Sequence, residues 1–562
     1  MIQSTRIFLV ILSVLEITFL NSAFAEINSK KQAAIATAHP MATQAGIQIL
    51  EQGGNAFDAA VAISATLAVV EPFSSGIGGG GFWLLHNAET KKNIMVDGRE
   101  TAPLASSETM YQDEVGELIK GASINGALAA GIPGEPAALI HIAKKYGRIP
   151  LSQSLAPAIK AAQNGFKVTR MYQRMVRFRF KALRKSPAAA KVFLYSNRVP
   201  HLGYLVKQPD LAETLLAMAK QGQAGFYQGG VAKALVKGVQ EAGGIWSMKD
   251  LAKYKIKERQ PIVGQYKNFK IISAAPPSSG GIALVTMLNI LEQYNLEKMK
   301  PAQRMHVTVE AMRRAYRDRA EYLGDPDFIS INSKKLLSKQ YATQLNKTIE
   351  LNKATPSSEL KPAVPVAQGQ HTTHFSVVDK EGNRVSATLS INYPFGSCFM
   401  PPGTGVLLND EMDDFSSKPG TPNVYGLVGN KNNAIQPGKR MLSSMSPTIV
   451  ENSHNNDYAV IGTPGGSRII TMVLHGILGF TENKSAKEIV SLPRYHHQYL
   501  PDRIQIEHNS ISENDQSKLK RKGHLIKNLT GRFGNMQVVV YKNNKITAAS
   551  DLRGEGLAAV VR

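Results

Sequence analysis

The apolar residues of the first hundred positions follow the spacing of helices and then that of a strand. Residues 41–51 carry apolar side chains at helical spacing, which predicts an amphipathic helix. From a cap at Asn55 or Asp58 to about Val70 the sequence is very apolar, so we expect a second helix that is buried on all faces. A run of glycines follows, and residues 82–85 then predict a strand.

Helical patterns alternate with short loops between residues 100 and 350, and no internal repeat is visible. The segment 352–370 is rich in proline, serine, alanine and lysine and has little periodicity, so we expect a flexible loop there. The clearest helical patterns cover residues 139–145, 155–164, 211–220 and 305–323.

Two alternating segments, residues 371–379 and 384–392, predict a β-hairpin. If its loop is residues 380–382, Thr372 lies opposite Ser390 and Asn392 is a diagonal neighbour, whereas a shift by one residue puts Asn392 opposite. Both registers group two hydroxyls and an amide on one face, and a two-residue loop would separate them. From the pattern alone, this group is either a catalytic site or a cross-strand pair that only stabilises the sheet.

The composition excludes several classes of protein. The 562 residues are 43% hydrophobic and 19% charged, which excludes a disordered or collagen-like chain. The net charge of +23 would suit a nucleic-acid-binding protein, but no such motif accompanies it, so we expect no nucleic-acid partner. The basic, partly aromatic segment 170–185 is interpreted as a solvated helix face. The single cysteine, Cys398, excludes an intrachain disulfide. With no histidine or basic residue near it in sequence, it is expected to be a packed small residue.

The amino terminus has the pattern of a secretory signal peptide. Arg6 precedes a short apolar run that Glu16 interrupts, and residues 23–25 (AFA) fit the small-x-small pattern of a cleavage site. The run is shorter than the ~20 residues that span a bilayer, so we expect residues 1–25 to be removed and no membrane anchor to remain. The mature chain is then expected in the periplasm or outside the cell.

Two further motifs suggest other kinds of site. The glycine run at residues 76–81 could cradle phosphate, but no Lys-Ser/Thr follows it and the order is helix, loop, strand. We expect close backbone packing there instead. The pair His496-His497 could bind a metal, but adjacent side chains point apart and no third ligand is evident. We therefore expect hydrogen-bonded structural histidines, and no cofactor.

The segment that begins at Thr372, residues 372–379 (TTHFSVVD), resembles the signature at the start of the small subunit of γ-glutamyltranspeptidases. The resemblance covers essentially the whole mature chain, and so many ordered motifs make chance agreement negligible. The other matching segments are residues 76–81, 96–103, 407–416, 418–427, 440–449, 465–470 and 493–498.

The resemblance implies an α+β protein with the N-terminal-nucleophile hydrolase fold, a four-layer αββα sandwich built from both subunits. It also implies that Thr372 attacks the carbonyl of His371 in the precursor and that water cleaves the resulting ester. The products are a large subunit, residues 26–371, and a small subunit, residues 372–562. The cut frees an α-amine on Thr372, and an amine with a pKa near neutral can take the proton of the threonine hydroxyl.

The implied substrates are glutathione and other γ-glutamyl compounds, and the implied acceptors of the γ-glutamyl group are water, amino acids and dipeptides. The substrate carries a carboxylate and an ammonium on one carbon, so its site needs groups of both charges. The motif matches assign the α-carboxylate to Arg99, Ser443 and Ser444, and the α-ammonium to Asn392, Glu411 and Asp414.

Three more roles follow from the resemblance. The backbone N–H groups of Gly465 and Gly466 form the oxyanion hole. Ser390 orients the nucleophile at a position where many members of the family carry threonine, so the β-branch that fixes χ1 is lost and we expect slower processing or turnover. Residues 419–440 match the loop that covers the pocket in many bacterial members, with Tyr425 at its tip.

Two alternatives remain open. A related acylase that acts on glutaryl or cephalosporin amides would have a substrate without an ammonium, for which Glu411 and Asp414 have the wrong charge. The second alternative is a processed but non-catalytic binding protein.

Overall fold

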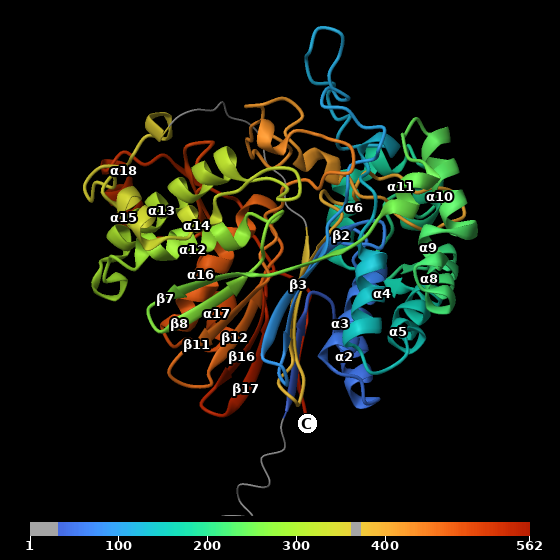
Figure 1. The fold of residues 1–562 in the computed structure, drawn as a ribbon, viewed down its shortest axis with the longest axis horizontal. Helices are drawn as coiled ribbons and strands as arrows, with labels where there is room; N and C mark the ends of the chain where they lie inside the picture. The colour runs from blue at the N-terminus through green and yellow to red at the C-terminus, as the bar shows by residue number, and fades with distance from the viewer. Residues whose placement is uncertain (1–31, 361–371) are drawn as a thin grey trace, which may run out of the picture.

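The computed structural model describes residues 32–360 and 372–562, and these form four layers (Figure 1). Two β-sheets pack face to face in the middle, and helices cover the outer face of each sheet (Figure 1). This confirms the expected α+β class and the αββα sandwich. The proposed signal peptide, residues 1–25, and residues 361–371 of the expected loop and cleavage segment lie outside the described residues.

The first sheet has seven antiparallel strands among the described residues. Its central pair is the predicted hairpin, with Leu389 opposite Thr373, and this register sets Thr372 beside Ser390. The hairpin loop is residues 380–382, because the N–H of Asp379 donates to the carbonyl of Asn383 at 3.1 Å. In spatial order the strands are β18 (Leu557–Val561), β1 (Ala33–Thr37), β9 (Thr373–Val378), β10 (Arg384–Ser390), β2 (Gly80–Asn87), β3 (Lys92–Gly98) and β6 (Lys257–Arg259).

The second sheet has six antiparallel strands in the described part of the chain. Small and branched side chains from both sheets fill the space between them, among them Ala36, Leu84 and Val460. Ser376 on β9 donates to the carbonyl of Val460 at 3.1 Å, which fixes the hairpin against this sheet. The strands, in spatial order, are β17 (Lys545–Ser550), β16 (Gln537–Lys542), β12 (Tyr458–Gly462), β11 (Thr448–Asn452), β8 (Phe269–Ser273) and β7 (Ile262–Tyr266).

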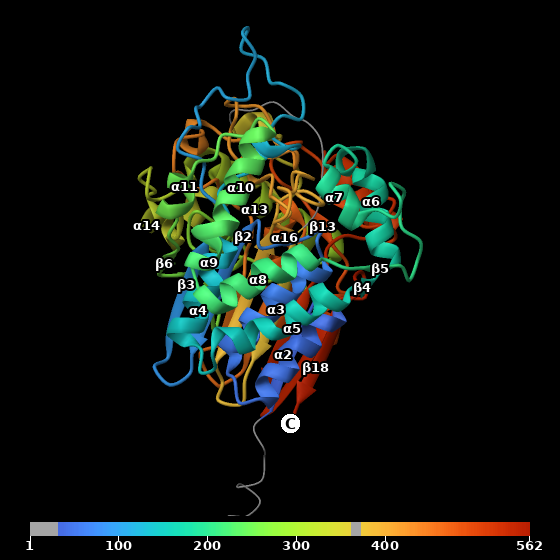
Figure 2. The same cartoon turned by 90° about the vertical axis from the view of Figure 1, so that its right-hand side faces the viewer.

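The helices outside the first sheet share one large apolar core with it (Figure 2). The predicted all-apolar helix is buried along its whole length; Asn55 caps it and Asp58 completes the capping box. The helices of this layer are α2 (Pro40–Glu51), α3 (Ala56–Val70), α4 (Glu135–Tyr146), α5 (Leu151–Asn164), α6 (Arg170–Leu183), α7 (Pro187–Phe193), α8 (Pro209–Gln221), α9 (Ala224–Tyr227), α10 (Gly229–Glu241) and α11 (Met248–Lys253).

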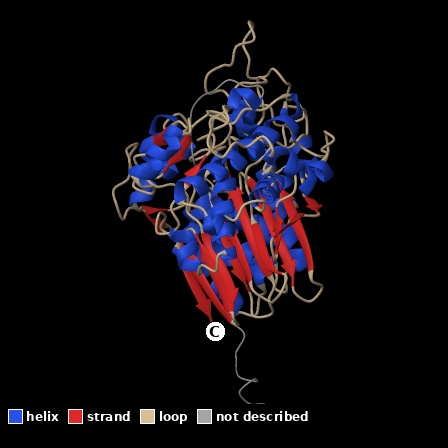
Figure 3. Ribbon diagram, turned by 90° about the vertical axis from the view of Figure 1, so that its left-hand side faces the viewer, coloured by secondary structure: helices blue, strands red, loops and turns tan. Residues whose placement is uncertain are grey.

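The helices outside the second sheet enclose a separate apolar core (Figure 3). With α4, α5, α8 and α13, all four helices expected between residues 139 and 323 are confirmed. The helices of this layer are α12 (Gly280–Leu291), α13 (Pro301–Tyr322), α14 (Ser333–Leu336), α15 (Lys339–Asn346), α16 (Ile469–Thr481), α17 (Ala486–Ser491) and α18 (Glu513–Arg521). Short strands outside the two sheets are β4 (Phe166–Lys167), β5 (Leu205–Val206), β13 (Tyr495–His496), β14 (Ile504–Ile506) and β15 (Ile526–Asn528).

Two expectations need correction. The loop expected at residues 352–370 contains a 3₁₀ turn at Ser357–Leu360 in its described part. Cys398 is buried as expected, and burial raises the pKa of its thiol to about 11, but a basic partner does lie beside it. Arg179, a buried residue of the basic helix α6, donates from Nε to Cys398 Sγ at 3.2 Å. Within the described residues, no helix has the length and apolarity needed to cross a bilayer.

Candidate active site

A cavity of about 20 Å³ lies at the end of the β9–β10 hairpin. This is close to the space of a single water molecule, so a larger ligand fits only if side chains of the lining move. Eleven residues were predicted to form the site, and nine of them line this cavity: Arg99, Thr372, Ser390, Asn392, Asp414, Tyr425, Ser443, Ser444 and Gly466. Of the other two, Gly465 lines a larger neighbouring cavity and Glu411 pairs with Arg99.

Strand alternation and a glycine contact position the candidate nucleophile. Thr372 directly precedes β9 and is buried, and the next residue, Thr373, points to the other face of the sheet. There the Thr373 hydroxyl donates to Glu71 at 2.7 Å, at the end of α3. Directly before the neighbouring strand β2, a Cβ on Gly79 would lie 2.2 Å from the carbonyl oxygen of Ser390. The glycine run therefore packs tightly against the site, as expected.

Asn392 reaches the site by a different route from the one that the sequence predicted. β10 ends at Ser390, and Asn392 has a φ of 71°, so it is not a diagonal neighbour within the strand. The cause is local, because the Ser390 hydroxyl accepts the N–H of Asn392 at 2.8 Å and turns the chain. The Asn392 side chain then donates to the carbonyl of Asp410 at 2.9 Å.

A buried cluster of charges surrounds Arg99. Its Nη1 donates to Glu411 and its Nη2 to Asp414, both at 2.5 Å, and its Nε donates to the carbonyl of Met441 at 3.3 Å. These bonds use three of the five N–H donors of a guanidinium, so two remain for a ligand. Glu100 Oε2 lies 3.7 Å from Arg99 Nη1. Glu100 was not among the predicted site residues, although it is part of the matching segment 96–103.

Three carboxyl groups thus face the guanidinium of Arg99. Burial raises the pKa of Glu411 to about 7, although Arg99 opposes this shift. Burial raises the pKa of Glu100 as well, and the neighbouring Glu411 adds to the effect. Near neutral pH the cluster therefore holds a proton, and a cationic group would compete with that proton for the carboxylates.

The two serines at residues 443 and 444 also line the cavity. The carbonyl of Ser443 accepts the N–H and the hydroxyl of Ser279, at 2.8 and 2.7 Å, which holds this segment in place. The hydroxyl of Ser444 is buried and has no hydrogen-bond partner within the described chain, and the same holds for Glu411 Oε1. Buried polar atoms without partners are costly, so both atoms are suited to a polar ligand.

Tyr425 is part of the lining of the cavity. Its hydroxyl donates to the carbonyl of Asn392 at 2.5 Å, and its ring lies against Gly466, where a Cβ would come within 2.6 Å of it. The nearby Asn423 donates to Asp414 at 3.0 Å, so the loop is also fastened to the charged cluster. The residue predicted at the tip of the lid therefore lies next to two other residues of the predicted site, Asn392 and Gly466.

The two adjacent histidines have structural hydrogen bonds. His496 bonds to Thr471 at 2.8 Å, and His497 bonds to Asp502 at 3.1 Å. Burial lowers the pKa of His497 to about 4, which keeps it neutral at physiological pH. This agrees with the structural role expected from the sequence.

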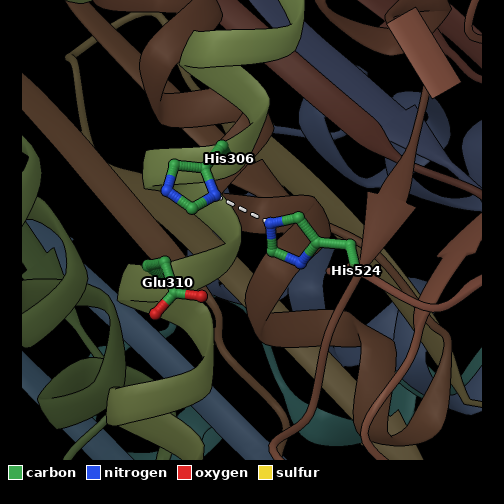
Figure 4. A group of neighbouring side chains, drawn as sticks. All are labelled: His306, Glu310 and His524. Carbon is green, nitrogen blue, oxygen red and sulfur yellow. Dashed lines mark hydrogen bonds between the residues drawn. The ribbon is translucent and has the colours of Figure 1, made fainter. Parts of the chain in front are cut away.

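A different histidine cluster went unrecognised in the sequence, because its residues are far apart (Figure 4). His306 Nδ1 lies 2.7 Å from His524 Nε2, and Glu310 is nearby. Glu310 already pairs with Arg314 at 2.6 Å and with Arg313 at 3.4 Å, so its charge is compensated. We interpret the cluster as a polar network that ties α13 to the segment after α18.

Comparisons with known proteins agree with this geometry. A family model described as gamma-glutamyltranspeptidase matches residues 42–561. Over 493 residues the chain is 44% identical to the glutathione hydrolase proenzyme of Pseudomonas sp. (strain A14), covering 87% of this chain and 85% of that protein. It is 39% identical to the glutathione hydrolase proenzyme of Escherichia coli (strain K12), covering 93% and 90% of the two chains.

Solved structures show the same relationship. The cephalosporin acylase from Bacillus halodurans superposes with a TM-score of 0.83 at 26% identity, covering 94% of this chain and 96% of that one. The Helicobacter pylori gamma-glutamyltranspeptidase has a TM-score of 0.57 at 42% identity, covering 58% of this chain and 94% of that one. Since the family model and both sequence relatives extend over most of its length, the chain belongs to the gamma-glutamyltranspeptidase family.

Proposed function

We propose that this enzyme cleaves the γ-glutamyl amide bond of glutathione and related γ-glutamyl compounds, and transfers the γ-glutamyl group to water, an amino acid or a dipeptide. The observation that carries this proposal is the small cavity, whose lining includes Arg99 and Asp414 together with Thr372. A γ-glutamyl group has both a carboxylate and an ammonium at one end and the scissile carbonyl at the other, so a site with charges of both signs beside a hydroxyl complements it.

The proposed maturation makes Thr372 an amino-terminal residue. Its hydroxyl attacks the carbonyl of His371, the peptide bond becomes an ester, and water cleaves the ester to give residues 26–371 and 372–562. The freed α-amine then takes the hydroxyl proton when Thr372 attacks a substrate. We propose as well that residues 1–25 direct export and are removed, which would place the enzyme in the periplasm or outside the cell.

In each turnover the Thr372 oxygen forms a bond to the γ-carbonyl carbon and the amide C–N bond breaks. The amine leaves with the proton from the hydroxyl. In the second step water or an acceptor amine attacks the ester, and the Thr372 oxygen regains a proton. The N–H groups of Gly465 and Gly466 are proposed to stabilise the oxyanion of both steps, where one donor is typically worth a few kcal/mol. Ser390, whose register position is beside Thr372, is proposed to orient the nucleophile.

The proposed recognition of the γ-glutamyl group divides between two sets of residues. Arg99, Ser443 and Ser444 take the α-carboxylate; the two unused donors of Arg99 and the unpartnered hydroxyl of Ser444 support this. Asn392, Glu411 and Asp414 take the ammonium; the raised pKa of Glu411 supports this, because an incoming cation stabilises its ionised form.

Intact-mass measurement of the purified protein tests the maturation. We expect two chains, with the smaller one beginning at Thr372, and a single uncut chain for Thr372→Ala. A wild-type protein that stays uncut after prolonged incubation would refute the proposed cleavage. A binding protein without catalytic activity would instead retain its full biological effect in Thr372→Ala.

Comparing γ-glutamyl-p-nitroanilide with glutaryl-p-nitroanilide tests the substrate class. The two compounds differ only in the α-ammonium of the γ-glutamyl group, since both carry the carboxylate, and Glu411 and Asp414 are proposed to bind the ammonium. We expect a clear preference for the γ-glutamyl compound. Preference for the glutaryl compound would favour an acylase, the class of enzyme to which the Bacillus halodurans relative is assigned by its name.

A further inference from the structure

A second, larger and open cavity adjoins the small one. It has a volume of about 370 Å³, and Thr372 belongs to the lining of both cavities. Gly465 lines the open cavity and Gly466 the small one. A substrate whose scissile carbonyl sits between these glycines therefore places one half in each cavity. Since the γ-glutamyl half is assigned to the small cavity, the open one faces the leaving group and the acceptor.

The open cavity carries two guanidinium groups that are available to a ligand. Arg174 lies on α6 and Arg532 on the loop before β16, and both side chains are exposed. In the described residues Arg532 has no hydrogen-bond or ion-pair partner, and the one side-chain bond of Arg174 is a 2.9 Å contact to the weak acceptor Met171 Sδ. The third arginine, Arg553, differs because its guanidinium is held by Glu507 at 2.7 Å and by further acceptors.

We propose that Arg174 and Arg532 make this cavity select leaving groups and acceptors that carry a free carboxylate. The inference rests on the proposed γ-glutamyl transfer. A guanidinium matches a carboxylate in charge and geometry. The lining of the cavity holds three arginines against two acidic residues, Glu71 and Glu555, so its excess positive charge favours an anionic partner over a neutral amide. Both arginines touch the departing or arriving half of the substrate, so they determine specificity and take no part in proton transfer.

The matched substrates for the test are γ-glutamylglycine and γ-glutamylglycinamide, which differ only in the carboxylate of the leaving group. We compare four enzymes, each after cleavage into its two subunits: the wild type, Arg174→Gln, Arg532→Gln and the double variant. We expect the ratio of kcat/KM for the acid to kcat/KM for the amide to fall about tenfold in the double variant, the size of one charge-assisted contact. The loss should appear mainly in KM for the acid.

Arg177→Gln is the control, because Arg177 is an exposed arginine of the same helix that does not line the cavity. Its ratio should equal that of the wild type. A double variant with the wild-type ratio would overturn the inference, and so would an equal loss on both substrates, which marks a structural role. If the wild type cleaves neither compound, the proposed γ-glutamyl transfer fails instead.

Discussion

The contact between the Tyr425 ring and Gly466 allows a quantitative prediction. A Cβ on Gly466 would lie 2.6 and 2.7 Å from two carbons of the Tyr425 ring, whereas carbon atoms pack at about 3.5 Å or more. In Gly466→Ala the ring must move by roughly 1 Å. The Tyr425 hydroxyl then loses its 2.5 Å bond to the carbonyl of Asn392. Alanine at a φ of 55° adds about 1 kcal/mol of backbone strain.

Gly420→Ala separates these two effects. Gly420 lies in the same lid loop with a φ of 80°, but nothing lies within 4 Å of an added Cβ, so this variant has the backbone strain alone. We expect the Tyr425 bond to form again once the γ-glutamyl group is bound. On that basis kcat/KM for γ-glutamyl-p-nitroanilide should be at least about fivefold lower in Gly466→Ala than in Gly420→Ala, the value of one lost hydrogen bond. The loss should not add to that of Tyr425→Phe in the double variant, because both remove the same bond. Equal losses in the two alanine variants would refute the reasoning.

Three further predictions concern protons and the nucleophile. Glu411 ionises as the pH rises through about 7, so glutamate should bind more weakly below that pH and its inhibition constant should rise there. Glu411→Gln should flatten this dependence on pH. Burial raises the pKa of Glu71 from 4.5 to about 7. Between pH 4.5 and about 7 the folded state therefore holds a proton on Glu71 that the unfolded state has lost. The stability that this proton contributes is lost as the pH rises through that range. Relative to wild type, Glu71→Gln should gain up to about 3 kcal/mol of unfolding free energy between pH 4 and pH 8 in urea titrations, and a constant difference would contradict this. Ser390→Thr should speed precursor cleavage or turnover by at most about threefold, because threonine at this position fixes one of the three χ1 rotamers that serine can adopt. Slower turnover would show that the added methyl group does not fit.

The hairpin could be predicted from the sequence because a strand has a period of two and the loop has three residues, which together set Thr372 beside Ser390. The path of Asn392 could not be predicted, because the Ser390 hydroxyl accepts the N–H of Asn392 and the strand ends at Ser390, two residues earlier than expected. The pairing of Arg99 with Glu411 joins residues 312 positions apart, so no local pattern reveals it. Only the resemblance to a family placed both residues in one site, and it assigned them to different groups of the same substrate without indicating their contact.

The small volume of the cavity links substrate binding to the lid loop. A volume of about 20 Å³ has no room for a γ-glutamyl group, so side chains of its lining must move for a substrate to bind. Two of the bonds that hold the lid loop end on residues proposed to bind the ammonium: Tyr425 bonds to the backbone of Asn392, and Asn423 bonds to the carboxylate of Asp414. An ammonium at Asp414 would compete with Asn423 for the same acceptor, whereas a substrate without an ammonium would leave that bond intact. We therefore expect the lid loop to open more readily for a γ-glutamyl group than for a glutaryl group.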